Sequence, residues 1–275
     1  MRLIASTAHR WEEISIILFH EPPKTLDVIQ PLLALPRDSF ASLKRAMLRF
    51  EHDRRGSAAS RLWEMFYASP ALRTVQLSYI RMQAPPSILR QLTRLGVNVI
   101  GSDEVMDLLR ACPQLEIFQA IVQPPSHIFP GIEDGYLIPI VPTPIVLPHL
   151  RVLMLSGLYD WSHFFEGLAA PRLDRLDMNQ TGIQADAVQG MLQRSCAQLR
   201  MLALRSIYAG NDSEIVALLR CDELRHLEIL RHVPYEGYDD PPDLFDPSPY
   251  LPPGIALVTR AYEEAENAYQ SMRRT

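Results

Sequence analysis

The three cysteines look patterned, because Cys112, Cys196 and Cys221 each stand three residues before a leucine. A metal site would need several such side chains to converge on one ion. The first cysteine lies three repeats before the second in the pattern described below, which separates them by roughly 15 Å at the usual spacing of neighbouring strands. We therefore expect small, buried side chains with free thiols. Their odd number indicates a reducing compartment, the cytoplasm or the nucleus.

The other residues that could bind metal or catalyse show no convincing spacing. Among the eight histidines there is no HxxxH or HxH pair, although His226 and Glu228 stand two apart and could form a polar pair on one strand face. The acidic stretch Asp239–Asp246 resembles a calcium loop only loosely, since its sixth and twelfth positions hold Leu244 and Tyr250 instead of glycine and glutamate. Neither a phosphate-binding glycine loop nor a nucleophile elbow is present. We expect no catalytic residue, no metal and no cofactor.

A leucine phrase, Leu-x-x-Leu-x-Leu, organises the second half of the chain. It begins at residues 150, 173, 199 and 224, so the steps are 23, 26 and 25 residues. Self-similarity with this step is typical of a leucine-rich repeat, in which the last two apolar residues point inward from a short strand. The phrase reads Leu150/Leu153/Leu155, Leu173/Leu176/Met178, Leu199/Leu202/Leu204 and Leu224/Leu227/Ile229.

The same phrase can be followed upstream with less regular steps. Its matches are Trp11/Ile14/Ile16, Leu43/Ala46/Leu48, Leu72/Val75/Leu77, Leu92/Leu95/Val97 and Leu115/Phe118/Ala120. The nine phrases predict an α/β fold, a leucine-rich-repeat solenoid or horseshoe with a curved parallel sheet and outer helices. Since no single coil could bury its own apolar face, the stack would be the cooperative unit.

Helix-like sequence lies between the phrases. Apolar stripes predict helices over Thr25–Leu35 and Ser57–Ala68, and a capped, acidic start predicts one over Ser102–Ala111. Thr181 and Gln184 have the spacing of a capping box before a further helix, and Asp212 or Ser213 would cap a helix over Ile215–Leu219.

Two stretches interrupt the pattern and suggest the domain organisation. Residues 123–148 are rich in proline, which favours a loop or edge strands leaving the solenoid. Residues 231–253 combine prolines with aspartates, and an amphipathic helix over roughly Ala256–Arg273 would cover the last coil. We therefore predict a solenoid over residues 1–230 with an insertion at 123–148, followed by a capping region over 231–275.

Composition limits the classes of partner. The formal net charge is -5 and the pI is near 5.9, so no basic excess is available to neutralise nucleic-acid phosphates. No apolar run approaches the ~20 residues of a membrane span. We expect neither nucleic acid nor membrane as a partner.

One surface is the predicted binding site. Residues that alternate with the inward leucines would face the open, concave side of the sheet, with apolar residues in the middle row and polar ones beside it. The alternative is that these are ordinary strand residues tolerated by solvent. The predicted partner-binding residues are Gln76, Arg94, Gln119, Met154, Arg175, Asp177, Met201, Arg205, His226 and Glu228.

The phrases LPHLRVLMLSG, LAAPRLDRLDMNQT, LQRSCAQLRMLALRS and LLRCDELRHLEIL resemble the repeats of fungal F-box proteins with C-terminal leucine-rich repeats. Ser6–Leu18 is similar to the segment that follows the F-box and opens the first strand. The resemblance implies repeats that select a protein for ubiquitination, while the F-box docks to the adaptor of a cullin ligase. No Leu-Pro-x-Glu phrase precedes Trp11, so the F-box itself is not seen. The chain is then either truncated or uncoupled from the ligase.

The predicted function is a non-catalytic protein–protein interaction module with its partner on the concave face. An uncoupled repeat scaffold is the alternative within the same class. An enzyme with a site at the strand ends, or in the loop over 123–148, is the alternative from another class, and no nucleophile with a base supports it.

Overall fold

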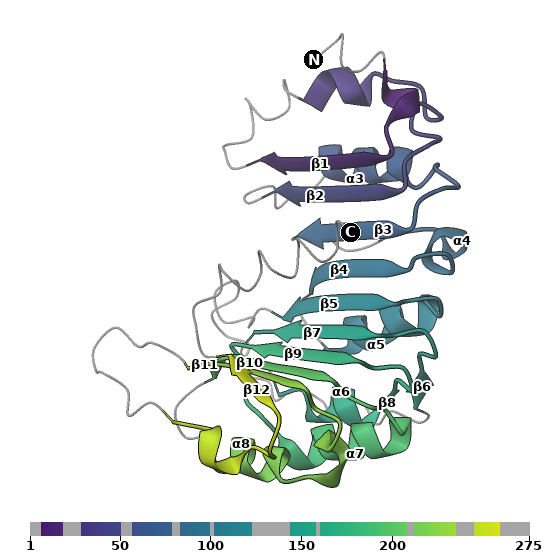
Figure 1. Ribbon diagram of the computed structural model, residues 1–275. Helices are drawn as coiled ribbons and strands as arrows, with labels where there is room; N and C mark the ends of the chain where they lie inside the picture. The colour runs from purple at the N-terminus through teal and green to yellow at the C-terminus, as the bar shows by residue number, and fades with distance from the viewer. Residues whose placement is uncertain are drawn as a thin grey trace, which may run out of the picture. The chain divides into compact units, whose positions relative to one another are not determined.

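The computed structural model describes residues 7–18, 29–50, 57–78, 83–99, 102–122, 144–157, 160–207, 212–234 and 245–258. The chain forms two compact units, and their helices and strands are labelled in Figure 1. Unit 1 comprises residues 1–125 with 147–150, and unit 2 comprises residues 126–146 with 151–275. Each unit contains a parallel sheet with helices in the connections between strands, so the predicted α/β class with a parallel sheet is confirmed.

In unit 1, five described strands follow one another in chain order and pair in parallel. They are β1 (Glu13–Leu18), β2 (Arg45–Phe50), β3 (Thr74–Ser78), β4 (Arg94–Val99) and β5 (Ile117–Val122). The connections contain helical residues 29–33, α3 (Ser57–Phe66), α4 (Pro86–Leu89) and α5 (Ser102–Ala111), and η1 (Ala8–Arg10) precedes β1. The helix predicted over 102–111 is therefore confirmed, and the one predicted over 57–68 is confirmed but ends at Phe66. Of the helix predicted over 25–35, residues 29–33 are helical, and the helix ends two residues earlier than predicted.

Unit 2 repeats this arrangement, with parallel strands again in chain order. The strands are β7 (Val152–Ser156), β9 (Arg175–Asn179), β10 (Met201–Ile207), β11 (Ile229–Pro234) and β12 (Ala256–Val258). The connections contain α6 (Ser162–Glu166), α7 (Ala185–Ser195), α8 (Asp212–Leu219), η3 (Asp222–Leu224) and η4 (Ser248–Tyr250), and a separate pair is formed by β6 (Ile145–Val146) and β8 (Leu168–Ala169).

The inward residues of neighbouring strands form rows in register. In unit 1, one row consists of Ile14, Ala46, Val75, Leu95 and Phe118, all buried. In unit 2, Leu153 lies opposite Leu176, and Leu176 lies opposite Leu202. Period-2 alternation places these side chains on one face of the sheet, against the helices, and their burial is the main stabilising contribution to each unit.

The last phrase is out of register with the prediction. Leu202 lies opposite Leu230, not Leu227, so the phrase is Leu227/Leu230/His232. The prediction that Leu227 stands in the row of Leu202 is wrong. The physical reason is that the residues before Leu227 form the short helix η3, whose buried Leu224 fills the turn instead of opening the strand.

Helix ends also differ from the sequence reading. Gln184 is the N-cap of α7, and its side chain makes no capping hydrogen bond. Thr181 Oγ1 donates to the carbonyl of Gly182 at 3.2 Å. Glu214 of α8 accepts a hydrogen bond from the amide of Ala185 at 2.9 Å. The acid that satisfies this helix start therefore comes from the next helix along the chain, which a local motif does not reveal.

The C-terminal part of unit 2 extends the sheet. Strand β11 crosses the predicted division at residue 230, and β12 pairs with it in parallel. The predicted capping helix does not begin at Ala256, because Ala256–Val258 is strand β12; residues 259–273 lie outside the described part of the chain. The predicted insertion falls largely on residues 123–143, which are also outside it, and ends in strand β6.

Candidate functional site

On unit 1, the face opposite the apolar rows is built from three rows of side chains across β1 to β5. The middle row is Ser15, Met47, Gln76, Gly96 and Gln119, which the strand register places side by side. Gln76 and Ser15 are exposed and the other three are half-buried. The predicted binding residues Gln76, Gln119 and Arg94 are thus on one accessible face of unit 1.

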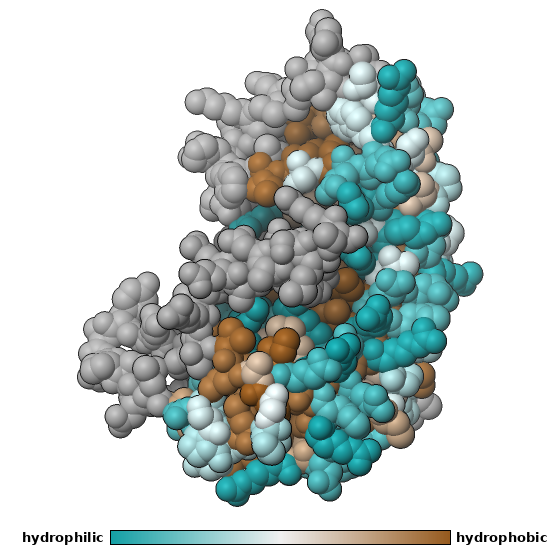
Figure 2. Space-filling model, in the orientation of Figure 1, coloured by the Kyte–Doolittle hydropathy of each residue, from teal (hydrophilic) through white to brown (hydrophobic). Residues whose placement is uncertain are grey.

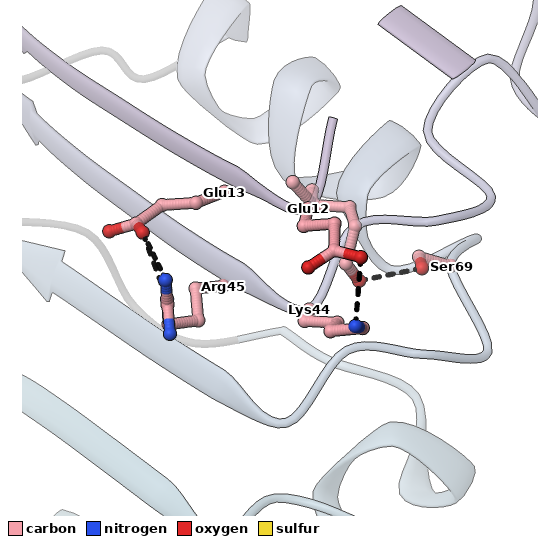
Figure 3. Close-up of polar contacts among 6 residues, drawn as sticks. Glu12, Glu13, Lys44, Arg45 and Ser69 are labelled. Atoms are coloured by element: carbon pink, nitrogen blue, oxygen red, sulfur yellow. Dashed lines mark hydrogen bonds and ion pairs between the residues drawn. The ribbon is translucent and has the colours of Figure 1, made fainter. Parts of the chain in front are cut away.

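The row next to it brings charges together. It consists of Glu13, Arg45, Thr74, Arg94 and Ile117. Arg45 Nε donates to Glu13 Oε2 at 3.0 Å, and the two side chains point toward each other in Figure 3. Both are more than half exposed, so this pair contributes little to stability and is available to a partner.

A second ladder of ion pairs lies one residue before the strands. In unit 1, Lys44 Nζ lies 2.9 Å from Glu12 Oε1 (Figure 3). In unit 2, four residues of alternating sign occupy this position on successive strands: Arg151, Asp174, Arg200 and Glu228. Their distances are 3.9 Å for Arg151–Asp174, 4.0 Å for Asp174–Arg200 and 2.8 Å for Arg200–Glu228. Sequence reasoning missed this ladder.

Two buried serines connect segments that are far apart in the sequence. Ser69 Oγ donates to the carbonyl of Leu43 at 2.8 Å and is also drawn in Figure 3. In unit 2, Ser195 Oγ accepts from the amide of Ala170 at 2.9 Å and donates to the carbonyl of Met191 at 2.6 Å. Both serines satisfy backbone groups 25 or more residues away, so their role is structural.

The corresponding face of unit 2 carries a buried ion triad. Asp177 Oδ2 lies 2.9 Å from Arg175 Nη2, and Asp177 Oδ1 lies 2.8 Å from Arg205 Nη2. Arg175 is 5% exposed and Asp177 is 1% exposed. The prediction that these two residues are open to a partner is therefore wrong. Their charges are compatible with burial because each guanidinium pairs with the shared carboxylate.

The two methionines among the predicted residues of unit 2 lie on the same face as the triad. Met154 and Met201 are half-buried on the triad's face, Met154 lying opposite Asp177. Figure 2 shows hydrophobic residues gathered over β10, β11 and β12 of unit 2, where Ile229 and Leu257 are half-buried.

His226 and Glu228 do not belong to the strand face, because the shift in register leaves them before β11. Both are exposed, and they form no pair with each other. Arg225 Nε donates to His226 Nε2 at 3.2 Å, while Arg200 binds Glu228.

The cysteines are free, as expected, but their burial differs. Cys112 is buried and Cys221 is half-buried, whereas Cys196 is exposed and adopts a left-handed conformation at the C-cap of α7. The expectation of a buried side chain is wrong for Cys196. Burial raises the pKa of Cys112 to about 12, and burial also raises the pKa of Cys221. These two thiols are therefore protonated at neutral pH and poor nucleophiles.

A buried histidine stands where the repeat would place a leucine. His232 lies opposite Leu204, is 3% exposed, and packs edge-on against Phe245 at 5.8 Å between ring centroids. Phe245 stacks on Tyr250, whose ring lies 5.5 Å from the guanidinium of Arg220. Burial lowers the pKa of His232, while the carboxylates of Asp212 and Asp246 act in the opposite direction.

The described residues contain no group of three or more histidine, cysteine, aspartate or glutamate side chains placed to hold a metal ion. None of the helices among them has the length and apolar character that crossing a membrane would require. Compared with models of known protein families and with curated protein sequences, the chain matches none.

Proposed function

We propose that this chain is a leucine-rich-repeat solenoid that acts as a non-catalytic protein-binding module. The observation that carries the proposal is the register of unit 1. Five successive parallel strands hold their apolar residues in buried rows and present Ser15, Met47, Gln76, Gly96 and Gln119 as a row on the opposite face. A surface of regularly spaced, mostly polar side chains on a rigid sheet suits recognition of another polypeptide.

The side chains of unit 1 support binding rather than catalysis. The face combines two amides, arginines and apolar residues, and Arg45 and Glu13 neutralise each other at its margin. Mixed polar and apolar character, with arginine available, is usual for protein-binding surfaces. Nothing on this face pairs a nucleophile with a base among the described residues.

The resemblance to fungal F-box proteins extends the proposal. In that family the repeats select the protein to be ubiquitinated, and this chain would supply that selecting part. Coupling to the ligase requires an F-box in the same polypeptide. Co-purification of the full gene product with the cullin adaptor tests the coupling, and failure to co-purify would leave an uncoupled repeat scaffold.

Photo-cross-linking tests the binding face directly. A photoreactive phenylalanine analogue replaces Gln76, or, as a control in the same unit, the exposed Arg61 of α3. After irradiation in cell extract, the adducts are identified by mass spectrometry. We expect polypeptides that are cross-linked through position 76 and not through position 61. Equal labelling from both positions, or none from position 76, would contradict the proposal.

A further inference from the structure

We propose that the strand face of unit 1 binds an extended, acidic segment of a partner protein, with Gln76, Gly96 and Gln119 contacting its main chain and Arg94 contacting its carboxylates. The inference rests on the proposed function and adds the chemistry of the partner. It concerns unit 1 alone.

The charge of this face supports an acidic partner. Among the described residues of β1 to β5 that point to this face, Arg45 is paired with the single acid Glu13, and Arg94 adds a positive charge. The whole chain carries a formal net charge of -5, so the sign of the face is opposite to that of the protein. Complementary charge of this kind raises association rates and excludes basic partners.

Arg94 is the arginine of this face that is best placed to bind a partner's carboxylate. It is exposed and stands on β4 between Thr74 of β3 and Ile117 of β5. Glu13 is three strands away on β1 and is engaged by Arg45. A carboxylate that lies over β4 can therefore approach the planar guanidinium of Arg94, which suits bidentate recognition.

The centre of the face offers two amides to a bound main chain. Gly96 lies between Gln76 and Gln119 on neighbouring strands. A β-carbon at Gly96 would lie 3.2 Å from Cγ of Gln76, so glycine at this position makes room for the Gln76 side chain. The amides of Gln76 and Gln119 can each donate to a carbonyl and accept from an amide of a bound chain. Main-chain contacts of this kind are typical of extended-peptide recognition.

The dimensions of the face determine the segment that fits. Five strands at ~4.8 Å spacing span roughly 19 Å, which an extended chain covers with about six residues. A segment lying across the strands would place one or two carboxylates near Arg94 while its backbone passes the amides of Gln76 and Gln119. We therefore expect an acidic segment of about six to ten residues.

Selection of displayed peptides tests this inference. The probe is a library of random peptides of about twelve residues, long enough to cross the five strands, selected on the purified full chain. We expect enrichment of aspartate and glutamate. Binding of the enriched peptides should weaken as sodium chloride rises from ~50 to ~300 mM, because exposed charges are screened.

Three variants test whether the enriched peptides bind to the strand face of unit 1. Arg94→Glu should weaken the enriched peptides about tenfold, since an attraction is replaced by a repulsion. Gly96→Leu should weaken them because the added side chain displaces Gln76, and circular dichroism with thermal melting checks that the variant is folded. Arg61→Glu on α3 is the matched charge reversal and should bind like the unaltered chain.

The outcomes separate this inference from the proposed function. If the enriched peptides are neutral or basic but are still lost in Gly96→Leu, the acidic partner is wrong and protein binding on the face stands. Enriched peptides that bind Arg94→Glu and Arg61→Glu equally overturn the role of Arg94. If no peptide is enriched, and position 76 yields no cross-link, both proposals fail.

Discussion

Arg200 and Glu228 form a two-pronged ion pair between residues 28 positions apart. Arg200 Nε donates to Glu228 Oε1 at 2.8 Å, and Nη2 donates to Oε2 at 2.9 Å. The pair continues a backbone ladder in which the amide of Glu228 donates to the carbonyl of Arg200 at 2.9 Å. The side-chain pair and the main-chain hydrogen bond therefore agree on the register between β10 and β11 of unit 2.

This pair should be visible in the titration of Glu228. The hydrogen bonds from Arg200 hold the pKa of the Glu228 carboxyl below its usual value. In Arg200→Ala, the pKa should return toward the ordinary value of glutamate, as measured by NMR of the side-chain carboxyl. Arg225→Ala removes a nearby exposed arginine and should leave it unchanged. An unaltered pKa in Arg200→Ala would show that the pair does not form in solution.

The register of the last phrase could have been predicted from the alternating charges of the ion-pair ladder. The residue after the first leucine of each phrase alternates in sign: Arg151, Asp174, Arg200 and Glu228. Choosing Leu224 as that leucine would place Arg225 beside Arg200. The leucines alone do not distinguish the two registers. Leu224 and Leu227 are both buried, so either could be the first leucine of the phrase. The charges do distinguish them, since like charges on neighbouring strands are destabilising.

The register can be checked with two substitutions on β11. Leu230 is fully buried, whereas Ile229 is half-buried on the opposite face. Leu230→Ala should destabilise the protein by about 2–5 kcal/mol through lost burial and a cavity. Ile229→Ala should cost about 1 kcal/mol. Urea unfolding measures both, and a larger loss for Ile229→Ala would restore the register predicted from the leucines alone.

The sequence predicts which residues lie on the face away from the core, but it does not predict whether they are exposed. Alternation along the strands places Gln76, Arg94 and Gln119 correctly on the face away from the core. The same rule places Arg175 and Asp177 on that face of unit 2, where the structure buries them. Burial of a strand's second face depends on packing beyond the strand itself, and local sequence does not encode it.

Removing the shared carboxylate of the triad should be costly. In Asp177→Ala, Arg175 and Arg205 each lose the ion pair with Asp177, and breaking a buried pair costs about 3–5 kcal/mol. The exposed Asp186 of α7 provides the control, because Asp186→Ala should change the free energy of unfolding by about 0.5 kcal/mol or less. Equal effects in urea unfolding would mean that the triad contributes nothing to stability.

His232 should make the stability of the protein depend on pH. Burial lowers its pKa below the ordinary histidine value of 6.5, in spite of the opposing effect of Asp212 and Asp246. The unfolded chain therefore binds the proton more tightly than the folded one. The contribution is complete above the unfolded pKa and is lost as pH falls from about 6.5 toward the folded pKa.

Replacing His232 by leucine, the residue found opposite it at position 204, tests whether its titration changes the stability. His232→Leu should remove part of the difference in free energy of unfolding between pH about 7.5 and pH about 5.5. His226→Leu is the matched control, because His226 is exposed and should leave the difference as it is. If His232→Leu and the unaltered chain lose stability equally on acidification, the buried imidazole is not the group that titrates, and the acid sensitivity belongs to other residues.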